Sequence, residues 1–135
     1  MAVASKLKHC GVNFRTYGNF DVVSPENLSI GDNVSINNGV YINARGGIVI
    51  GNNVALSAGA KIISTSLQAS SLSSKEHVDA PVVIGSAVQI GAGAIILPGV
   101  IIGNNTIIGA GAVMTRNADS NSIYAGAPGR KIRQL

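Results

Sequence analysis

The sequence predicts an all-β chain folded as a parallel β-helix, a three-sided prism built from hexapeptide repeats. Five consecutive hexads run from Ile84 to Val113, and each opens with isoleucine and carries a small or β-branched residue at its fifth position. A weaker copy of the same period lies upstream, between Ile30 and Ile62. A strict period of six residues is typical of such a prism.

The 135-residue chain is expected to form one domain with five segments. Residues 1–23 are predicted to be an N-terminal arm, and residues 24–66 the first coils. Within these coils the isoleucine period slips by two positions at the motif GGIVIG and then resumes. We interpret this slip as a short insertion at a corner of the prism.

Residues 67–83 are predicted to be a loop extruded from the coil. Ile62 and Ile84 are 22 positions apart, where 18 or 24 would preserve the phase, and the segment SLQASSLSSKEHVDAP is polar and aperiodic. Loops on a rigid scaffold are frequent places for functional residues.

Residues 84–113 are the regular coils. If three flat faces make one coil, every sixth side chain points inward, and equivalent residues of stacked coils lie about 4.8 Å apart. The stretch from Ala80 to Thr115 carries no charge, so a membrane helix is the alternative. A step of six residues is about 240° on a helix, however, and would scatter the isoleucines over three faces. We therefore predict no membrane span.

Residues 114–135 are predicted to be a short basic C-terminal tail. The net charge is +4, and the tail contains Arg116, Arg130, Lys131 and Arg133. Basic ends attract nucleic acids or phosphorylated small molecules. Aromatic residues for base stacking are few, so we favour a small molecule and expect no nucleic-acid partner. The single cysteine and the lack of a signal peptide predict a cytoplasmic protein.

The motifs APVVIG, VQIGAGAIILPGVIIG, IIGAGAVMTR and YAGAPGRKIR resemble the hexapeptide-repeat acyltransferases, in particular the galactoside and maltose O-acetyltransferases and their polysaccharide O-acetyltransferase relatives. The resemblance covers about residue 24 to the C-terminus. It implies a left-handed parallel β-helix and a homotrimer with active sites between subunits. It also implies acetyl-CoA as the donor and a hydroxyl group as the acceptor.

Attack of an alcohol on a thioester requires a general base, for which histidine is the natural candidate. Members of the family place it in a context similar to I-x-T-x-S-H-D, and by that alignment Leu67 stands where the histidine is expected. Of the two histidines, His9 lies in the predicted arm. His77 lies at the end of the loop with Glu76 and Asp79 near enough in sequence to orient an imidazole, and we take it as the catalytic candidate. The plainer alternative is a polar loop residue.

The family holds the pantetheine arm of the donor with backbone groups of the late coils, and the phosphates with basic residues after them. The positions that match are Gly91, Ala92, Gly109 and Ala110 for backbone contacts, and Thr115, Arg116, Arg130 and Lys131 for polar ones. Arginine and lysine suit phosphates on electrostatic grounds. A merely solubilising tail is the alternative for the basic residues.

Asn37, Asn38, Asn43 and Arg45 resemble the segment where sugar-modifying relatives place acceptor ligands. Amide side chains both donate and accept hydrogen bonds and so suit sugar hydroxyls. They also cap turns, which is the structural alternative.

Two histidines cannot supply the three zinc ligands of a γ-class carbonic anhydrase from one chain, and we expect no metal. Two functions remain. The first is an acetyl-CoA-dependent O-acetyltransferase acting on a sugar or polysaccharide precursor by direct transfer. The second is a catalytically impaired homologue that serves as a binding or structural subunit, which the missing histidine favours.

Overall fold

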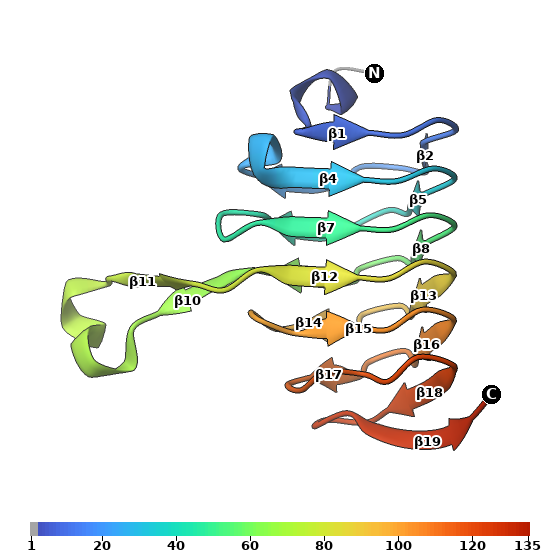
Figure 1. Cartoon of the computed structure of the whole chain (residues 1–135). Coiled ribbons are helices and arrows are strands. Elements are labelled where there is room, and N and C mark those ends of the chain that lie inside the picture. The colour runs from blue at the N-terminus through green and yellow to red at the C-terminus, as the bar shows by residue number, and fades with distance from the viewer. Residues whose placement is uncertain (1–2) are drawn as a thin grey trace.

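Short parallel strands stack into three sheets that form the faces of a prism, described for residues 3–135 in the computed structural model (Figure 1). Sheet A contains β1 (His9–Cys10), β4 (Leu28–Ile30), β7 (Ile48–Ile50), β12 (Val82–Ile84) and β15 (Ile101–Ile102). Sheet B contains β2 (Arg15–Thr16), β5 (Ser35–Ile36), β8 (Ala55–Leu56), β13 (Val88–Ile90), β16 (Thr106–Ile108), β18 (Ser122–Ala125) and β19 (Arg130–Gln134). Sheet C contains β3 (Asp21–Val23), β6 (Tyr41–Asn43), β9 (Lys61–Ile63), β14 (Ile95–Ile96) and β17 (Val113–Met114). The predicted left-handed β-helix is confirmed.

Two further strands and three short 3-10 helices complete the fold. β10 (Thr65–Leu67) and β11 (His77–Asp79) form an antiparallel hairpin that projects from the prism (Figure 1). The 3-10 helices are η1 (Ala4–Lys6), η2 (Pro25–Asn27) and η3 (Ala69–Ser74), and η3 lies at the hairpin tip. No helix within residues 3–135 is long and apolar enough to cross a membrane.

The core consists of three ladders of aliphatic side chains, one from each sheet. In sheet A, Ile30, Ile50, Ile84 and Ile102 are register partners in successive coils, and each is at most 2% exposed. Sheets B and C repeat this arrangement around Ile90 and Ile96. Complete burial of one such side chain is worth roughly 1.5–3 kcal/mol, so the hexad period itself supplies the stabilising core.

The insertions into the coil all lie at one edge of the prism, where sheet C is followed by sheet A. The first coil carries η2 there, the second a turn closed by the Gly47 N–H to the Ala44 carbonyl, and the third the hairpin. The second insertion is the one predicted from GGIVIG. This edge is therefore where the rigid prism displays its extra chain.

Residues 9–23, predicted as an arm, instead form the first coil. Strands β1, β2 and β3 pair in parallel with β4, β5 and β6. The hexad period does not reveal the first coil, because its inward positions are poor in isoleucine. They hold half-buried residues such as Cys10, Phe14 and Phe20. The predicted tail also contributes structure, since β18 continues sheet B and β19 folds back against it in antiparallel register.

Candidate functional site

The root of the hairpin is tied to the neighbouring coil by Ser64, which is fully buried. Its hydroxyl donates to the Asn43 carbonyl over 2.7 Å and accepts from the Gly46 N–H over 2.8 Å. The Ala80 N–H donates to the Ser64 carbonyl over 2.9 Å, which closes the base of the hairpin from its other strand. The hairpin thus leaves the prism from a fixed point.

His77 lies directly across this hairpin from Leu67, its register partner. Leu67 is the residue that stands where the sequence resemblance expects a histidine. Antiparallel neighbours on one face have Cβ atoms about 4.5–5.5 Å apart, so the two strands bring His77 to nearly the same place as the missing side chain. The hairpin therefore brings His77 next to the position of Leu67.

Thr65 holds the ring of His77. Its Oγ1 lies 3.1 Å from Nδ1 of His77, and Thr65 itself is 6% exposed while His77 is exposed. The same hydroxyl donates to the Val78 carbonyl over 3.4 Å. With its proton directed there, Oγ1 accepts from Nδ1–H, which leaves a lone pair on Nε2. Nε2 then has the form that a general base needs.

The acidic neighbours expected to orient His77 do other work. The Asp79 carboxylate pairs with Arg45 across 3.5 Å, and Glu76 accepts a hydrogen bond from the Ser71 hydroxyl over 3.2 Å. Sequence proximity misleads here because each carboxylate already has another partner, Arg45 for Asp79 and Ser71 for Glu76. Thr65 was missed, since a threonine 12 positions away carries no sequence signal for contact with His77.

The four residues predicted to contact an acceptor occupy two different corners of one coil. Asn37 and Asn38 lie in the turn after β5, where Asn37 Oδ1 accepts from the Asn38 N–H and Asn38 Oδ1 from the Asn19 N–H. Asn43 is the last residue of β6 and Arg45 follows this strand, both beside the hairpin root. Asn43 donates to the Tyr41 hydroxyl over 3.2 Å and accepts from the Arg45 N–H. Asn43 and Arg45 therefore border the hairpin, whereas Asn37 and Asn38 cap a turn.

Gly91, Ala92, Gly109 and Ala110 form two stacked turns between sheets B and C. A Cβ on Gly91 would meet the Ala110 nitrogen at 2.5 Å, so glycine is required for the coils to approach. Gly111 donates to the Ala92 carbonyl, but the N–H groups of Ala92 and Ala110 have no backbone acceptor among the described residues. Both alanines are exposed. Two exposed alanines without a backbone acceptor for their N–H groups among the described residues thus lie along one edge.

The basic residues after the last regular coil are exposed, but Lys131 is engaged. Its Nζ lies 2.7 Å from the Asp119 carboxylate. This hydrogen bond, reinforced by the negative charge, raises the pKa of the Lys131 ammonium above its ordinary value. Arg130 begins β19 beside the turn of Gly126 and Gly129, which bonds to Val113. Thr115 and Arg116 directly follow β17. The predicted phosphate ligands are therefore spread over the last coil.

Comparisons with known proteins agree with this architecture. The family described as "Bacterial transferase hexapeptide (six repeats)" matches residues 81–116, and "Hexapeptide repeat of succinyl-transferase" matches residues 28–44. The chain is 34% identical to galactoside O-acetyltransferase of Escherichia coli (strain K12) over 127 residues, which are 94% of this chain and 54% of that protein. The chain spans about half the length of the curated relatives it matches.

Solved structures show the same prism. A maltose O-acetyltransferase from Clostridium difficile 630 superposes with a TM-score of 0.91 at 30% identity, over 98% of this chain and 72% of that one. A galactoside acetyltransferase in complex with coenzyme A superposes with a TM-score of 0.81, also at 30% identity, over 90% of this chain and 65% of that one.

Proposed function

Because the chain belongs to the hexapeptide-repeat acyltransferases, we propose that it is an acetyl-CoA-dependent O-acetyltransferase that acts on a sugar or polysaccharide-precursor hydroxyl. The observation that carries the proposal is the placement of His77 opposite Leu67, with Nδ1 held by Thr65. In this arrangement His77 supplies the general base that is missing at position 67. Two relatives named as galactoside or maltose O-acetyltransferases support the choice of a sugar hydroxyl.

The reaction is a direct transfer within a ternary complex. The acceptor oxygen attacks the thioester carbonyl carbon while Nε2 of His77 takes the hydroxyl proton. The tetrahedral adduct then collapses, the carbon–sulfur bond breaks, and the thiolate of coenzyme A recovers the proton from the imidazolium. Atoms and charges balance in this scheme with His77 as the only proton acceptor and donor.

The donor fits the edge that carries Ala92 and Ala110. Their exposed N–H groups suit the amide carbonyls of a pantetheine arm, and Gly91 and Gly109 allow the chain to approach. Thr115, Arg116 and Arg130 are placed to meet phosphates. Lys131 contributes less than predicted, because Asp119 already neutralises its charge.

The acceptor is assigned to the side of the prism that carries Asn43 and Arg45. Both lie next to the hairpin root, and Arg45 joins the hairpin through Asp79. Asn37 and Asn38 belong to another corner, so within one subunit they do not line the same space as His77. They reach an acceptor only if a second subunit brings that corner alongside the hairpin.

A homotrimer would provide this juxtaposition. The outer face of sheet A carries Val49, Val83 and Ile101 as direct register partners, exposed by 51%, 36% and 47%. Three apolar side chains in line on a flat face are a surface that a partner can cover. We place the contact between subunits on this face, from which the hairpin extends toward a neighbour.

The second function, a catalytically impaired homologue, is favoured by Leu67 at the expected histidine position. The two functions are separated by measuring release of the coenzyme A thiol from acetyl-CoA with a panel of galactosides, maltose and free glucose. The transferase predicts acceptor-dependent release that falls by about 100-fold or more in His77→Ala, since a general base contributes at least this much.

The matched control is His9→Ala, which removes the other histidine, from sheet A. It should leave turnover unchanged. Binding of acetyl-CoA without turnover on any acceptor would support the impaired homologue, and absence of binding would exclude both the donor site and the transferase. Calorimetric titration of acetyl-CoA against the wild type and Arg130→Ala measures the donor site separately from chemistry.

A further inference from the structure

A shallow hollow lies on sheet B at the N-terminal end of the prism, in the coil that the sequence does not reveal. It is lined by Asn13, Arg15, Tyr17, Asn33, Val34 and Ser35. None of these residues is acidic, and none belongs to the proposed donor site or to the hairpin. Strands β2 and β5 lie on one side of the prism, and the hairpin projects from the opposite side (Figure 1).

Arg15 stands directly over Ser35, its register partner in the next coil. The next residue in this column is Ala55. Small side chains below the arginine therefore create the hollow, and they leave its floor open. A larger residue at position 35 or 55 would fill the space that the guanidinium overhangs.

The guanidinium is held in place but not neutralised. Its Nε donates to Asn13 Oδ1 over 3.1 Å, and Asn13 in turn donates to Asn33 over 2.6 Å. No ion pair of Arg15 exists within residues 3–135. One edge of the fork is thus anchored through a neutral amide, so that both terminal amino groups and the whole positive charge stay available for a ligand.

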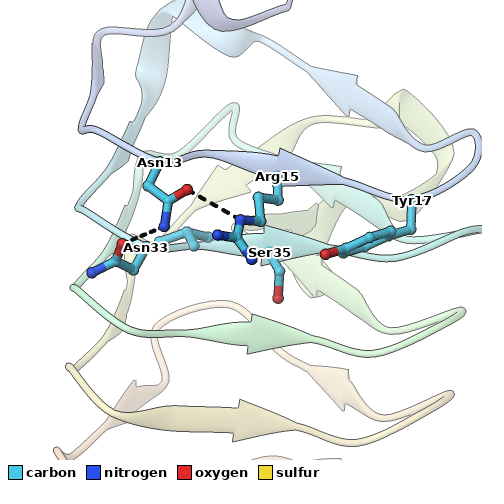
Figure 2. A pocket seen from close by; sticks show the side chains of 6 residues that line it. Asn13, Arg15, Tyr17, Asn33 and Ser35 are labelled. Atoms are coloured by element: carbon cyan, nitrogen blue, oxygen red, sulfur yellow. Dashed lines mark hydrogen bonds between the residues drawn. The ribbon is translucent and has the colours of Figure 1, made fainter.

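Tyr17 closes the other side of the hollow. Figure 2 shows its hydroxyl end directed along β5 toward Ser35 and Arg15, and all three side chains line the hollow. Tyr17 is 52% exposed, and its ring offers a flat apolar surface beside them. A ligand that fits has an anionic group for the arginine, hydroxyls for Ser35 and Tyr17, and a ring face for the tyrosine.

We propose that this hollow binds a sugar that carries a carboxylate, such as a uronic acid unit of an oligosaccharide. A carboxylate matches the planar fork of arginine with two parallel hydrogen bonds, whereas the hydroxyls of the sugar match the serine and tyrosine oxygens. The proposal rests on the proposed function only in the choice of a sugar. The hollow is a binding site separate from the acceptor side at Asn43 and Arg45.

The test is a binding measurement without acetyl-CoA, so that failure of the transferase leaves it interpretable. Three probes share one ring: glucuronate, glucose, and glucose 6-phosphate, which differ in the group on carbon 6. Ligand-observed NMR should show glucuronate bound more tightly than either of the others. Equal binding of glucose, tighter binding of the phosphate, or no binding of any probe would overturn the proposal.

Variants locate the site. Arg15→Gln should weaken glucuronate by about tenfold, because it removes a charged hydrogen-bond donor. Arg133→Gln is the matched control, since it removes the same charge from the far end of sheet B, where Arg133 pairs with Ile123. Tyr17→Leu should weaken the binding of glucuronate, because it removes both the ring face and the hydroxyl. Tyr17→Phe removes only the hydroxyl and should weaken glucuronate binding less. An equal loss in the two arginine variants would show general charge attraction and contradict a site at Arg15.

Discussion

Thr65 and His77 illustrate how one hydrogen bond decides what a side chain can do. An exposed histidine on a hairpin has free rotation, and its ring nitrogens exchange roles. A buried hydroxyl 3.1 Å from Nδ1 restricts that freedom, and when it accepts from Nδ1–H it leaves the lone pair on Nε2. The partner is a threonine rather than the carboxylates nearby in sequence, because Asp79 is paired with Arg45.

Thr65→Val keeps the shape of the side chain and removes this hydrogen bond. We expect kcat for acetyl transfer to fall by about tenfold, the equivalent of one ordinary hydrogen bond, with little change in the KM for acetyl-CoA. Thr65→Ser should restore most of the rate. If the valine variant changes only thermal stability while turnover stays at the wild-type level, Thr65 does not position His77.

Lys131 and Asp119 give a pH-dependent contact at the last coil. The pKa of Lys131 in the folded state is raised above its ordinary value of 10.5. The contribution of this contact to folding stability is therefore fully present below pH 10.5 and is lost as the pH rises through the raised pKa. NMR titration of the lysine side chain should show this upward shift. Asp119→Asn should return the titration toward the ordinary value, and an unchanged midpoint would disprove the contact.

At the scale of the elements, the corner between sheets A and B is a column made mostly of asparagines. Asn33, Asn53, Asn105 and Asn121 all adopt left-handed backbone angles, and their side chains bond from coil to coil where asparagines are adjacent. Asparagine suits the position because it tolerates positive φ and hydrogen-bonds locally. Ala87 interrupts the column at φ 57°.

Ala87→Asn should therefore stabilise the prism by about 1 kcal/mol, because it relieves an alanine in the left-handed region and completes the column. The measurement is the unfolding midpoint in urea. Ala87→Gly is the control, since it relieves the backbone alone and should give the smaller gain. An asparagine variant no more stable than the glycine variant would show that the bond across coils adds nothing.

Gly91 and Gly93 occupy one turn but are glycines for different reasons. A Cβ at Gly91 meets backbone atoms at 2.5–2.7 Å, whereas one at Gly93 meets nothing within 4 Å but has φ of +69°. Gly91→Ala should force the coils apart, cost about 1–3 kcal/mol and weaken acetyl-CoA binding. Gly93→Ala should cost about 1 kcal/mol with binding retained. Equal effects on binding would contradict the assignment of this edge to the donor.

At the scale of the whole molecule, the faces of the prism have distinct characters. Sheet A presents a line of exposed aliphatic side chains, the N-terminal end of sheet B presents the hollow around Arg15, and the edge between sheets C and A carries every insertion. A rigid prism can separate these surfaces because each residue's outward direction is set by its register. Assembly and ligand binding can then use different faces.

Val83→Lys tests the contact between subunits. Placed in the middle of the apolar line, the charge should convert the proposed trimer to monomers and abolish transfer while the monomer stays folded. Sedimentation velocity measures the assembly. Gln89→Lys adds the same charge to the outward face of the next strand, β13, and should leave the trimer intact. A trimeric Val83 variant would place the contact on another face.

Much of the fold follows from local chemistry that can be read along the chain. The residues from Ile84 to Val113 specify inward positions, corners and coil length, because a parallel stack forces equivalent residues onto one another. Cys10, Phe14 and Phe20 carry no such repeat, and the first coil forms only because β4, β5 and β6 offer edges for pairing. Pairing of that kind depends on the neighbouring coil.

The sequence by itself determined the prism, its slipped corner, the extruded loop and the family to which the chain belongs, because these depend on spacing. The tertiary structure alone decided that His77 faces Leu67, that Thr65 holds the imidazole, that Asp119 occupies Lys131, and that Arg15 and Tyr17 share a hollow. These contacts join residues from separate strands and turns. Only the folded strands and turns bring these residues next to one another.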